Sequence, residues 1–283
     1  MAKVITVMNM KGGVGKTTVA MHLGGMLGRR RFGNVRKVLI IDYDPQFNLS
    51  QAFIPPTQYF DIEEQRKTCL AILLDDESEV DPFRLQVPGN QSPPKVAELA
   101  HRIYPNLDIV PSTLDLMYVA LGQSDSRLKP CEERFEKFIA ECRTVYDLVI
   151  IDCHPAGSIL TKTSLQNSDH VIIPVVPQSF AIRGIALMLE FIKSKKMGPT
   201  GPVPHILFNR VARTGDPHPD EVLVRENPRF ARLCVTKTLK TYKIFGEPVG
   251  GVGFAWTSGK PYSTQALQNL SQVTEEIITR TGL

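Results

Sequence analysis

The chain has 283 residues, of which 42% are hydrophobic and 22% are charged, and its formal net charge is only +4. This composition is ordinary for a globular protein, and the length is sufficient for one large core. No apolar run approaches the roughly 20 residues that a membrane-spanning helix needs, and the glycine-rich start is unlike a signal peptide. Five widely spaced cysteines without a C-x-x-C pair indicate neither a disulfide framework nor a zinc finger. We therefore expect a cytosolic protein with reduced thiols and no membrane partner.

Short runs rich in valine, isoleucine and leucine recur along the chain and predict β-strands. They cover residues 3–8, 37–42, 107–110, 146–152, 170–176 and 205–208. The runs are continuous rather than alternating, which is typical of strands that are covered on both faces, as in a parallel sheet.

Segments with helical spacing lie between these runs, at residues 17–27, 133–142 and 182–192, and residues 271–283 predict a final amphipathic helix. The alternation predicts an α/β fold with a doubly wound, mostly parallel sheet, in a single domain over residues 1–283. Residues 75–94 interrupt the pattern, because they are first acidic and then proline-rich. We interpret them as a surface insertion, with a disordered loop without a role as the alternative.

A glycine-rich segment directly follows the first predicted strand, where residues 12–18 read G-G-V-G-K-T-T. Glycines let consecutive backbone N–H groups point at a phosphate, because no Cβ blocks the conformation or the approach. In such a loop Lys16 reaches the β- and γ-phosphates of a nucleotide and the Thr17 hydroxyl binds Mg²⁺. The positive end of the helix that begins near Lys16 adds to the anion site. The pattern predicts a nucleotide-binding loop.

The loop departs from the general G-x-x-x-x-G-K-[ST] form, because Met10 replaces the first glycine and Lys11 precedes the others. With K-G-G-V-G-K-T-T over residues 11–18, the chain resembles the ParA/MinD family of deviant Walker A ATPases, and most resembles the Soj-type members without an N-terminal helix-turn-helix domain. The resemblance implies a P-loop NTPase fold, ATP and Mg²⁺ as cofactors, and a homodimer that forms on ATP binding. In that dimer Lys11 reaches the phosphates of the other subunit; a solvated surface lysine is the alternative. The implied phosphate-binding residues are Lys11, Gly12, Gly13, Val14, Gly15, Lys16, Thr17 and Thr18.

Two further predicted strands end in aspartates, at the edge where open α/β sheets bind ligands. Residues 42–48 read D-Y-D-P-Q-F-N, which matches the family pattern D-x-D-P-Q-x-N. The resemblance implies that Asp44 orients or activates the attacking water and that Asp42 lies close to the Mg²⁺. Asp152, at the Walker B position, would hold Mg²⁺ through water. The implied catalytic residues are thus Lys11, Lys16 and Asp44, and the implied metal residues are Thr17, Asp42 and Asp152.

Two positions near these motifs stay open. The family usually continues the Walker B aspartate with x-Pro-Pro, whereas this chain has Cys153, His154 and Pro155. We interpret Cys153 as a small buried hydrophobe, and His154 as either structural or catalytic. Asn209 follows the sixth predicted strand, where the resemblance implies an adenine contact; a capping asparagine is the alternative.

The segment 225–243 concentrates basic charge against a single acid, Glu226. Its spacings of three and four predict one basic helix face, which would bind a phosphate backbone without reading bases. A merely solvated face is the alternative. The candidate DNA-binding residues are Arg225, Arg229, Arg232, Lys237, Lys240 and Lys243.

Together with these features, the resemblance implies a Mg²⁺-dependent ATPase whose ATP-bound dimer binds nonspecific DNA and whose hydrolysis a ParB-like adaptor protein stimulates. Such a cycle would segregate plasmid or chromosome DNA, or position a protein cargo, in the cytoplasm and on the nucleoid. The alternatives are a MinD-like spatial regulator that acts on protein partners, which the composition of the last helix disfavours, and a metabolic P-loop enzyme. An iron–sulfur carrier is disfavoured by the cysteine spacing.

Overall fold

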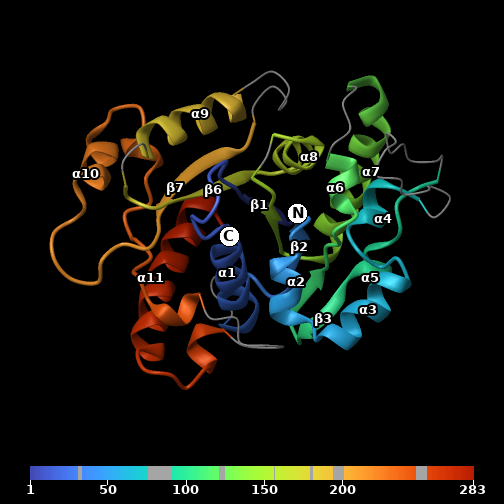
Figure 1. Cartoon of the computed structure of the whole chain (residues 1–283), viewed down its shortest axis with the longest axis horizontal. Helices are drawn as coiled ribbons and strands as arrows, with labels where there is room; N and C mark the ends of the chain where they lie inside the picture. Colours follow the sequence, from blue (N-terminus) through green and yellow to red (C-terminus); the bar gives the residue numbers. More distant parts are fainter. Residues whose placement is uncertain are drawn as a thin grey trace.

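The computed structural model of the protein describes residues 1–30, 34–75, 91–120, 125–155, 157–178, 181–193, 201–246 and 254–283. Within these ranges one seven-stranded sheet has the order β3-β4-β2-β5-β1-β6-β7 (Figure 1). Its strands are β1 Lys3–Val7, β2 Val38–Tyr43, β3 His101–Tyr104, β4 Leu107–Val110, β5 Leu148–Cys153, β6 His170–Val175 and β7 Val203–Phe208. All neighbouring pairs are parallel except β3 with β4.

The six predicted strands are confirmed as β1, β2, β4, β5, β6 and β7, with ends that shift by one or two residues. Strand β3 has no counterpart among the predictions. Adjacent residues within a strand are buried on opposite faces: Ile40 packs in one core and Ile41 in the other. This double burial explains why the strands are continuously apolar.

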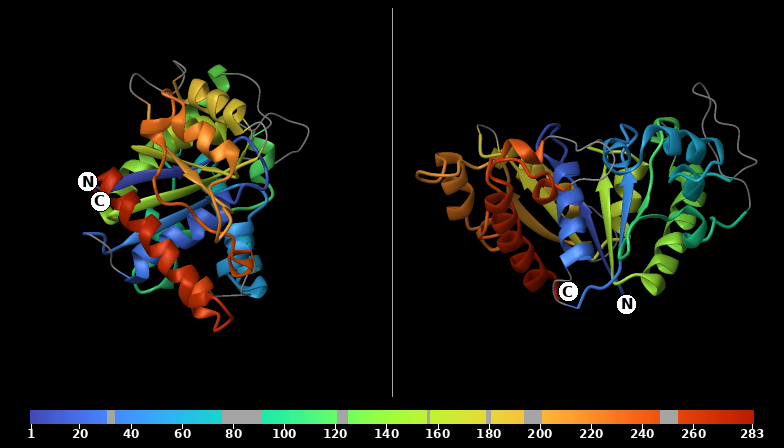
Figure 2. Two further views of the ribbon diagram at one scale, coloured as in Figure 1. Left: turned by 90° about the vertical axis from the view of Figure 1, so that its left-hand side faces the viewer. Right: turned by 90° about the horizontal axis from the view of Figure 1, so that it is seen from below.

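Helices cover both faces of the sheet. They are α1 Lys16–Arg30, α2 Asn48–Phe53, α3 Pro56–Glu64, α4 Leu70–Leu73, α5 Val96–Leu99, α6 Leu116–Ala120, α7 Asp125–Val145, α8 Ile159–Gln166, α9 Ala181–Lys193, α10 Pro219–Glu226 and α11 Ser263–Thr281. One core contains residues of α1 and α11, and the other contains residues of α7, α8 and α9. The two chain ends lie side by side at one end of the sheet (Figure 2). The doubly wound α/β architecture is therefore confirmed.

The prediction of one basic helix over residues 225–243 is wrong. Helix α10 ends at Glu226, and Asn227 at its C-terminus has extended backbone (φ −70°, ψ 119°). Pro228 follows and cannot continue the helix, because its ring has no N–H to donate and clashes with the preceding turn. Two short 3₁₀ turns, η2 Ala231–Leu233 and η3 Lys243–Phe245, lie farther along. The six basic residues therefore do not share one helix face.

The predicted insertion at 75–94 lies mostly outside the described residues, because the structure describes only residue 75 and residues 91–94 of it. The flanking residues are close in space, since the Gln91 backbone N–H lies 3.5 Å from Asp75 Oδ2. The buried guanidinium of Arg134 on α7 joins them by donating to carbonyl oxygens on both sides. Its acceptors are Ala71, Ile72, Leu74 and Gln91.

In the part of the chain that the structure describes, no helix combines the length and the apolar character needed to span a bilayer.

Candidate functional site

The loop between β1 and α1 has a backbone that glycine alone accommodates at two places. Gly13 and Gly15 have φ angles of 73° and 88°, in the left-handed region that L side chains avoid. A Cβ on Gly15 would also lie 2.4 Å from Asn209 Nδ2. The path of this loop therefore requires glycine at positions 13 and 15, and the loop ends where Lys16 opens α1.

Two asparagines form hydrogen bonds with the loop. Asn209, at the end of β7, is buried, and its Nδ2 donates to the Val14 carbonyl at 2.8 Å. Asn9 Nδ2 donates to the Pro174 carbonyl on β6 at 2.8 Å, while its Oδ1 accepts from the Lys11 N–H at 2.9 Å. The adenine contact of Asn209 stays a prediction, since its amide here binds the loop. Sequence reasoning missed Asn9, because its partner on β6 lies far along the chain.

The two loop lysines have different surroundings. Lys16 is buried, and its Nζ lies 3.3 Å from the Lys11 carbonyl oxygen. Burial lowers the pKa of Lys16, and the nearby carboxylates of Asp152 and Asp44 oppose that shift. The Lys11 side chain is exposed. One cation therefore points into the site and the other is accessible to a second molecule.

Asp42 and Asp152 lie side by side, because β2 and β5 pair in parallel with these two residues in register. Asp42 is completely buried, and its Oδ2 accepts from the Ser50 N–H at 2.8 Å and from the Ser50 hydroxyl at 2.7 Å. Burial raises the pKa of Asp42 to about 7, although the two bonds from Ser50 act in the other direction. Ser50, on α2, was not predicted.

Asp152 is the least satisfied polar group of the site. It is 1% exposed, and neither carboxylate oxygen has a hydrogen-bond partner among the described residues. Burial, and then the neighbouring Asp42, raise the pKa of Asp152 well above the usual carboxyl range. The Thr17 hydroxyl lies beside Asp152 but does not form a well-formed hydrogen bond with it. A buried carboxyl without a partner calls for a ligand. Two carboxylates and a hydroxyl are the oxygen donors that Mg²⁺ prefers, so the residues fit this ion.

Asp44 lies next to this pair at the end of β2. Its N–H donates to Asp42 Oδ1 at 3.4 Å, and its Oδ1 accepts from the Gln46 N–H at 3.0 Å. The following Phe47 has a left-handed backbone with φ 41° and ψ 30°. For a residue with a side chain this conformation is strained, and such strain concentrates at functional segments. The structure thus brings Lys16, Thr17, Asp42, Asp44 and Asp152 together at one edge of the sheet.

Residues 153 and 154 complete the end of β5. Cys153 is fully buried, as predicted. His154 is half-buried, and its backbone N–H donates to the Tyr43 carbonyl at 3.3 Å. This contact joins the ends of β5 and β2; a catalytic role of the imidazole stays a prediction.

His22 is a further residue that the sequence did not single out. It lies one turn after Thr18, whose carbonyl is 2.9 Å from His22 Nδ1, and its Nε2 accepts from the Ala255 N–H at 3.3 Å. Burial lowers the pKa of His22 to about 4, so the ring is neutral. Its neighbours Phe245, Phe254 and Trp256 come from the C-terminal third of the chain. The start of α1 is therefore tied to that distant segment.

Arg225, a candidate DNA contact, is engaged within the protein. Its Nε donates to the buried Glu221 carboxylate at 2.8 Å, and its guanidinium also donates to the Val235 carbonyl and lies over the Phe208 ring. This arrangement holds α10 against the following segment.

The other basic candidates follow the surface beside α11. The Lys237 backbone N–H donates to Glu276 and that of Lys240 to Asn269, both on α11, and the Arg232 carbonyl accepts from Arg280. The Lys240 side chain is half-buried, and four residues are exposed, namely Arg229, Arg232, Lys237 and Lys243. We call these four residues the basic strip; that they form one continuous surface and that this surface contacts DNA stay predictions.

Comparison with known proteins agrees with this geometry. A protein-family model described as an AAA domain matches residues 2–198. An uncharacterised protein of Mycobacterium tuberculosis is 31% identical over 100% of this chain and 80% of its own length. The sporulation initiation inhibitor protein Soj of Bacillus subtilis is 31% identical over 68% of this chain and 66% of Soj. A solved plasmid partition protein of Borrelia burgdorferi, bound to AMPPNP, has the same fold, with a TM-score of 0.69 and 21% identity over 96% of this chain and 97% of that one.

The family match covers the loop, both aspartate strands and β6, which are the parts that build the site. The chain therefore belongs to the AAA domain family as a P-loop ATPase of the ParA/MinD type.

Proposed function

We propose that this protein is an ATP-dependent positioning ATPase that segregates plasmid or chromosome DNA, or positions a protein cargo. The observation that carries the proposal is the buried, unpartnered carboxylate of Asp152 beside Asp42 and Thr17, close to the loop that ends in Lys16. Such a carboxylate suits a divalent cation that accompanies a triphosphate.

The chain's own residues would share the chemistry as follows. Lys16 binds the β- and γ-phosphates, because its side chain is buried at the end of the glycine-rich loop. Thr17 and Asp152 hold the cation, the latter through water, and Asp42 orients this shell through its own bonds to Ser50. A bound Mg²⁺ would neutralise the charge that develops on the phosphate oxygens. Asp44, at the edge of this group, orients the attacking water.

The switch between monomer and dimer would depend on Lys11. Its exposed side chain is free to meet the triphosphate held by a second copy, so that ATP joins two subunits and ADP releases them. The ATP-bound dimer would bind DNA of any sequence on the nucleoid in the cytoplasm, and a ParB-like adaptor would stimulate hydrolysis. Membership of the ParA/MinD type of ATPase supports this assignment.

The variant Asp44→Ala tests the proposed chemistry. We expect it to bind ATP and to sediment as a dimer, but to release phosphate about 10²–10⁴-fold more slowly than the wild type, because the water-orienting group is lost. Asp61→Ala, on the exposed side of α3, is the matched control and should turn over normally. Phosphate release is measured without added metabolite, which separates this function from that of a metabolic enzyme. Wild-type turnover in Asp44→Ala would remove Asp44 from the mechanism.

A further inference from the structure

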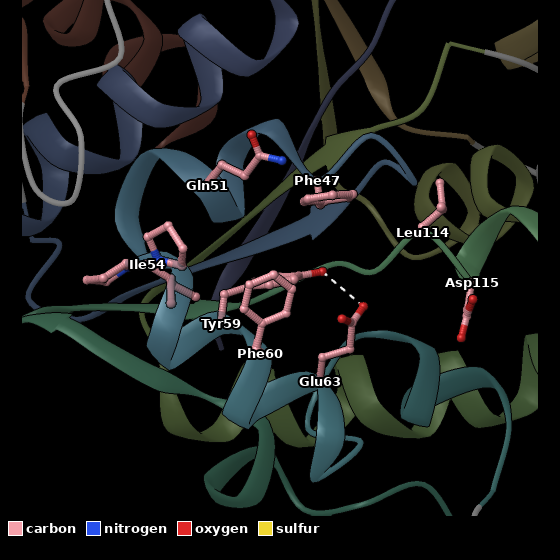
Figure 3. Close-up of a pocket in the computed structure, with 10 residues that line it drawn as sticks. Phe47, Gln51, Ile54, Tyr59, Phe60, Glu63, Leu114 and Asp115 are labelled. Atoms are coloured by element: carbon pink, nitrogen blue, oxygen red, sulfur yellow. Dashed lines mark hydrogen bonds between the residues drawn. The ribbon is translucent and has the colours of Figure 1, made fainter.

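A large apolar pocket lies beside the segment that follows Asp44. Its volume is about 980 Å³, and it is bounded by α2, α3 and the chain after β4 (Figure 3). The rings of Phe47 and Tyr59 stack at 5.3 Å with an interplanar angle of 13°, and Phe60 meets Tyr59 edge-on at 6.0 Å. The pocket therefore has an aromatic wall that starts three residues after Asp44.

The apolar wall extends onto the surface. Phe60 is 65% exposed and Leu114 is 47% exposed, and both line the pocket. Large apolar side chains grouped around a cavity mark an interaction site more often than apolar side chains scattered singly. Figure 3 shows these side chains around one common space, with the carboxylates of Glu63 and Asp115 to one side.

The two carboxylates give the pocket a negative rim. Glu63 Oε1 accepts from the Thr113 hydroxyl at 2.6 Å, which fixes its position. Burial, and then the charge of Glu63, raise the pKa of Asp115, so the two acids repel each other. Neither forms an ion pair within the ranges that the structure describes. A cation at this rim would relieve that repulsion.

A chain of hydrogen bonds joins the pocket to the metal-side carboxylate. The Tyr59 hydroxyl donates to the Ser112 carbonyl at 2.9 Å, and the Ser112 N–H donates to Ser50 Oγ at 2.9 Å. The Ser50 hydroxyl in turn donates to Asp42 Oδ2 at 2.7 Å. Phe47, whose strained backbone lies between Asp44 and α2, rests on the same Tyr59 ring. Displacement of the aromatic wall would therefore be felt at Asp42 and Asp44.

We propose that this pocket binds a short peptide segment of a partner protein, with an aromatic or branched apolar side chain between Phe47 and Phe60 and a lysine or arginine on Glu63 and Asp115. The occupant adjusts ATP hydrolysis through Tyr59, Ser112 and Ser50. The effect on ATP hydrolysis rests on the proposed function, whereas the binding of the peptide does not. The acidic rim favours a cationic peptide over a second copy of this chain, which would have to bring a basic apolar segment of its own.

The binding test is a selection of random short peptides, displayed on phage, on the full chain with a non-hydrolysable ATP analogue. We expect enriched peptides to pair an apolar anchor with a basic residue. Synthetic versions should bind Phe60→Ser and Asp115→Asn about tenfold or more weakly than the wild type, since a buried anchor dominates such interfaces. Leu223→Ser, which alters an exposed leucine on α10, should bind as the wild type does. Enriched peptides without basic residues, unchanged binding by Phe60→Ser, or no enrichment at all would overturn the proposal. The proposal would also be overturned if the free chain forms a dimer that Phe60→Ser abolishes, because the occupant of the pocket would then be a second copy of the chain.

The coupling test measures phosphate release with and without the selected peptide. The peptide should change the rate of the wild type, and Phe60→Ser should keep its basal rate without responding. Ser50→Ala should bind the peptide with wild-type affinity but lose the response. An equal response in Ser50→Ala would overturn the hydrogen-bonded route. If the wild type releases no phosphate, the proposed function fails, while the binding test still decides whether the pocket takes the peptide.

Discussion

Lys11 and Lys16 stand in one loop, but only Lys16 is buried against the carboxylates of the site. We expect Lys16→Ala to abolish nucleotide binding, because the loop loses its inward cation. Lys11→Ala should keep ADP binding and lose ATP-dependent dimerisation, because its side chain would act only on the other subunit's phosphates. Sedimentation with a non-hydrolysable ATP analogue measures both, with Lys129→Ala on the exposed side of α7 as the control. A Lys11→Ala protein that still dimerises contradicts the proposed role across the interface.

Asp152 allows a stability prediction that is independent of turnover. Because its pKa is raised, Asp152 of the folded, cation-free protein keeps its proton at pH values where the unfolded chain has already released it. The contribution of this group to the unfolding free energy therefore falls as the pH rises. We expect Asp152→Asn to flatten this dependence and to stabilise the cation-free protein by about 1–3 kcal/mol at about pH 8. Urea unfolding across a pH series measures it, and stabilisation by Mg²⁺ with an ATP analogue should be lost. Equal stability of the two proteins at every pH would show that Asp152 is not strained without a cation.

The residues that sequence alone could place are those at or just after the carboxyl ends of strands. Lys16, Asp42 and Asp152 meet because parallel strands bring their carboxyl ends to one edge. Asn9 and His22 could not be found in this way, because their partners, Pro174 and Ala255, lie far along the chain. Their roles depend on tertiary packing rather than on local pattern.

Arg134 shows how one side chain can organise several short elements. It is 4% exposed, and it satisfies the last carbonyls of α4 together with that of Gln91 beyond the predicted insertion. We expect Arg134→Met to lower the unfolding free energy by on the order of 3 kcal/mol, because buried carbonyls lose their donor while the apolar stem is kept. Lys137→Met, on the exposed face of the same helix, is the control. Urea unfolding of both variants provides the measurement, and equal stabilities would show that Arg134 does not hold these elements together.

Strands that are buried on both faces of the sheet were predicted from the sequence, whereas the more exposed strand β3 was not. The six predicted strands are mainly apolar runs, whereas β3 is four residues long with polar His101 and Arg102, and pairs only along one edge. The basic segment failed for another reason: its charge spacing suited a helix, but Pro228 prevents α10 from continuing past Asn227. The spacing of charges is thus weaker evidence for a helix than a proline is evidence against one.

At the scale of the whole molecule, the two candidate interaction surfaces lie toward opposite edge strands of the sheet. The aromatic pocket is lined by residues of α2 and α3, and the Lys237 backbone N–H of the basic strip donates to Glu276 on α11. Figure 1 shows α2 and α3 on one side of the molecule and α11 on the other. The nucleotide loop follows β1, between them in the strand order. One bound nucleotide is therefore placed to influence both surfaces.

The basic strip leads to a prediction about DNA. A monomer neutralises few phosphates, and pairing two strips in an ATP-bound dimer doubles the counterions released, so we expect tight duplex binding with ATP and weak binding with ADP. Replacing Arg232, Lys237 and Lys243 together by Ala should weaken binding to unrelated duplexes alike and reduce the salt slope by about one for each phosphate that is no longer neutralised. The fold should survive, because the strip is attached to α11 through backbone groups such as the Lys237 N–H. The control replaces Lys129, Lys137 and Lys193, which are also exposed and change the net charge equally. Fluorescence anisotropy over a salt series measures both variants, and an unchanged slope in the first would place the DNA surface elsewhere on the molecule.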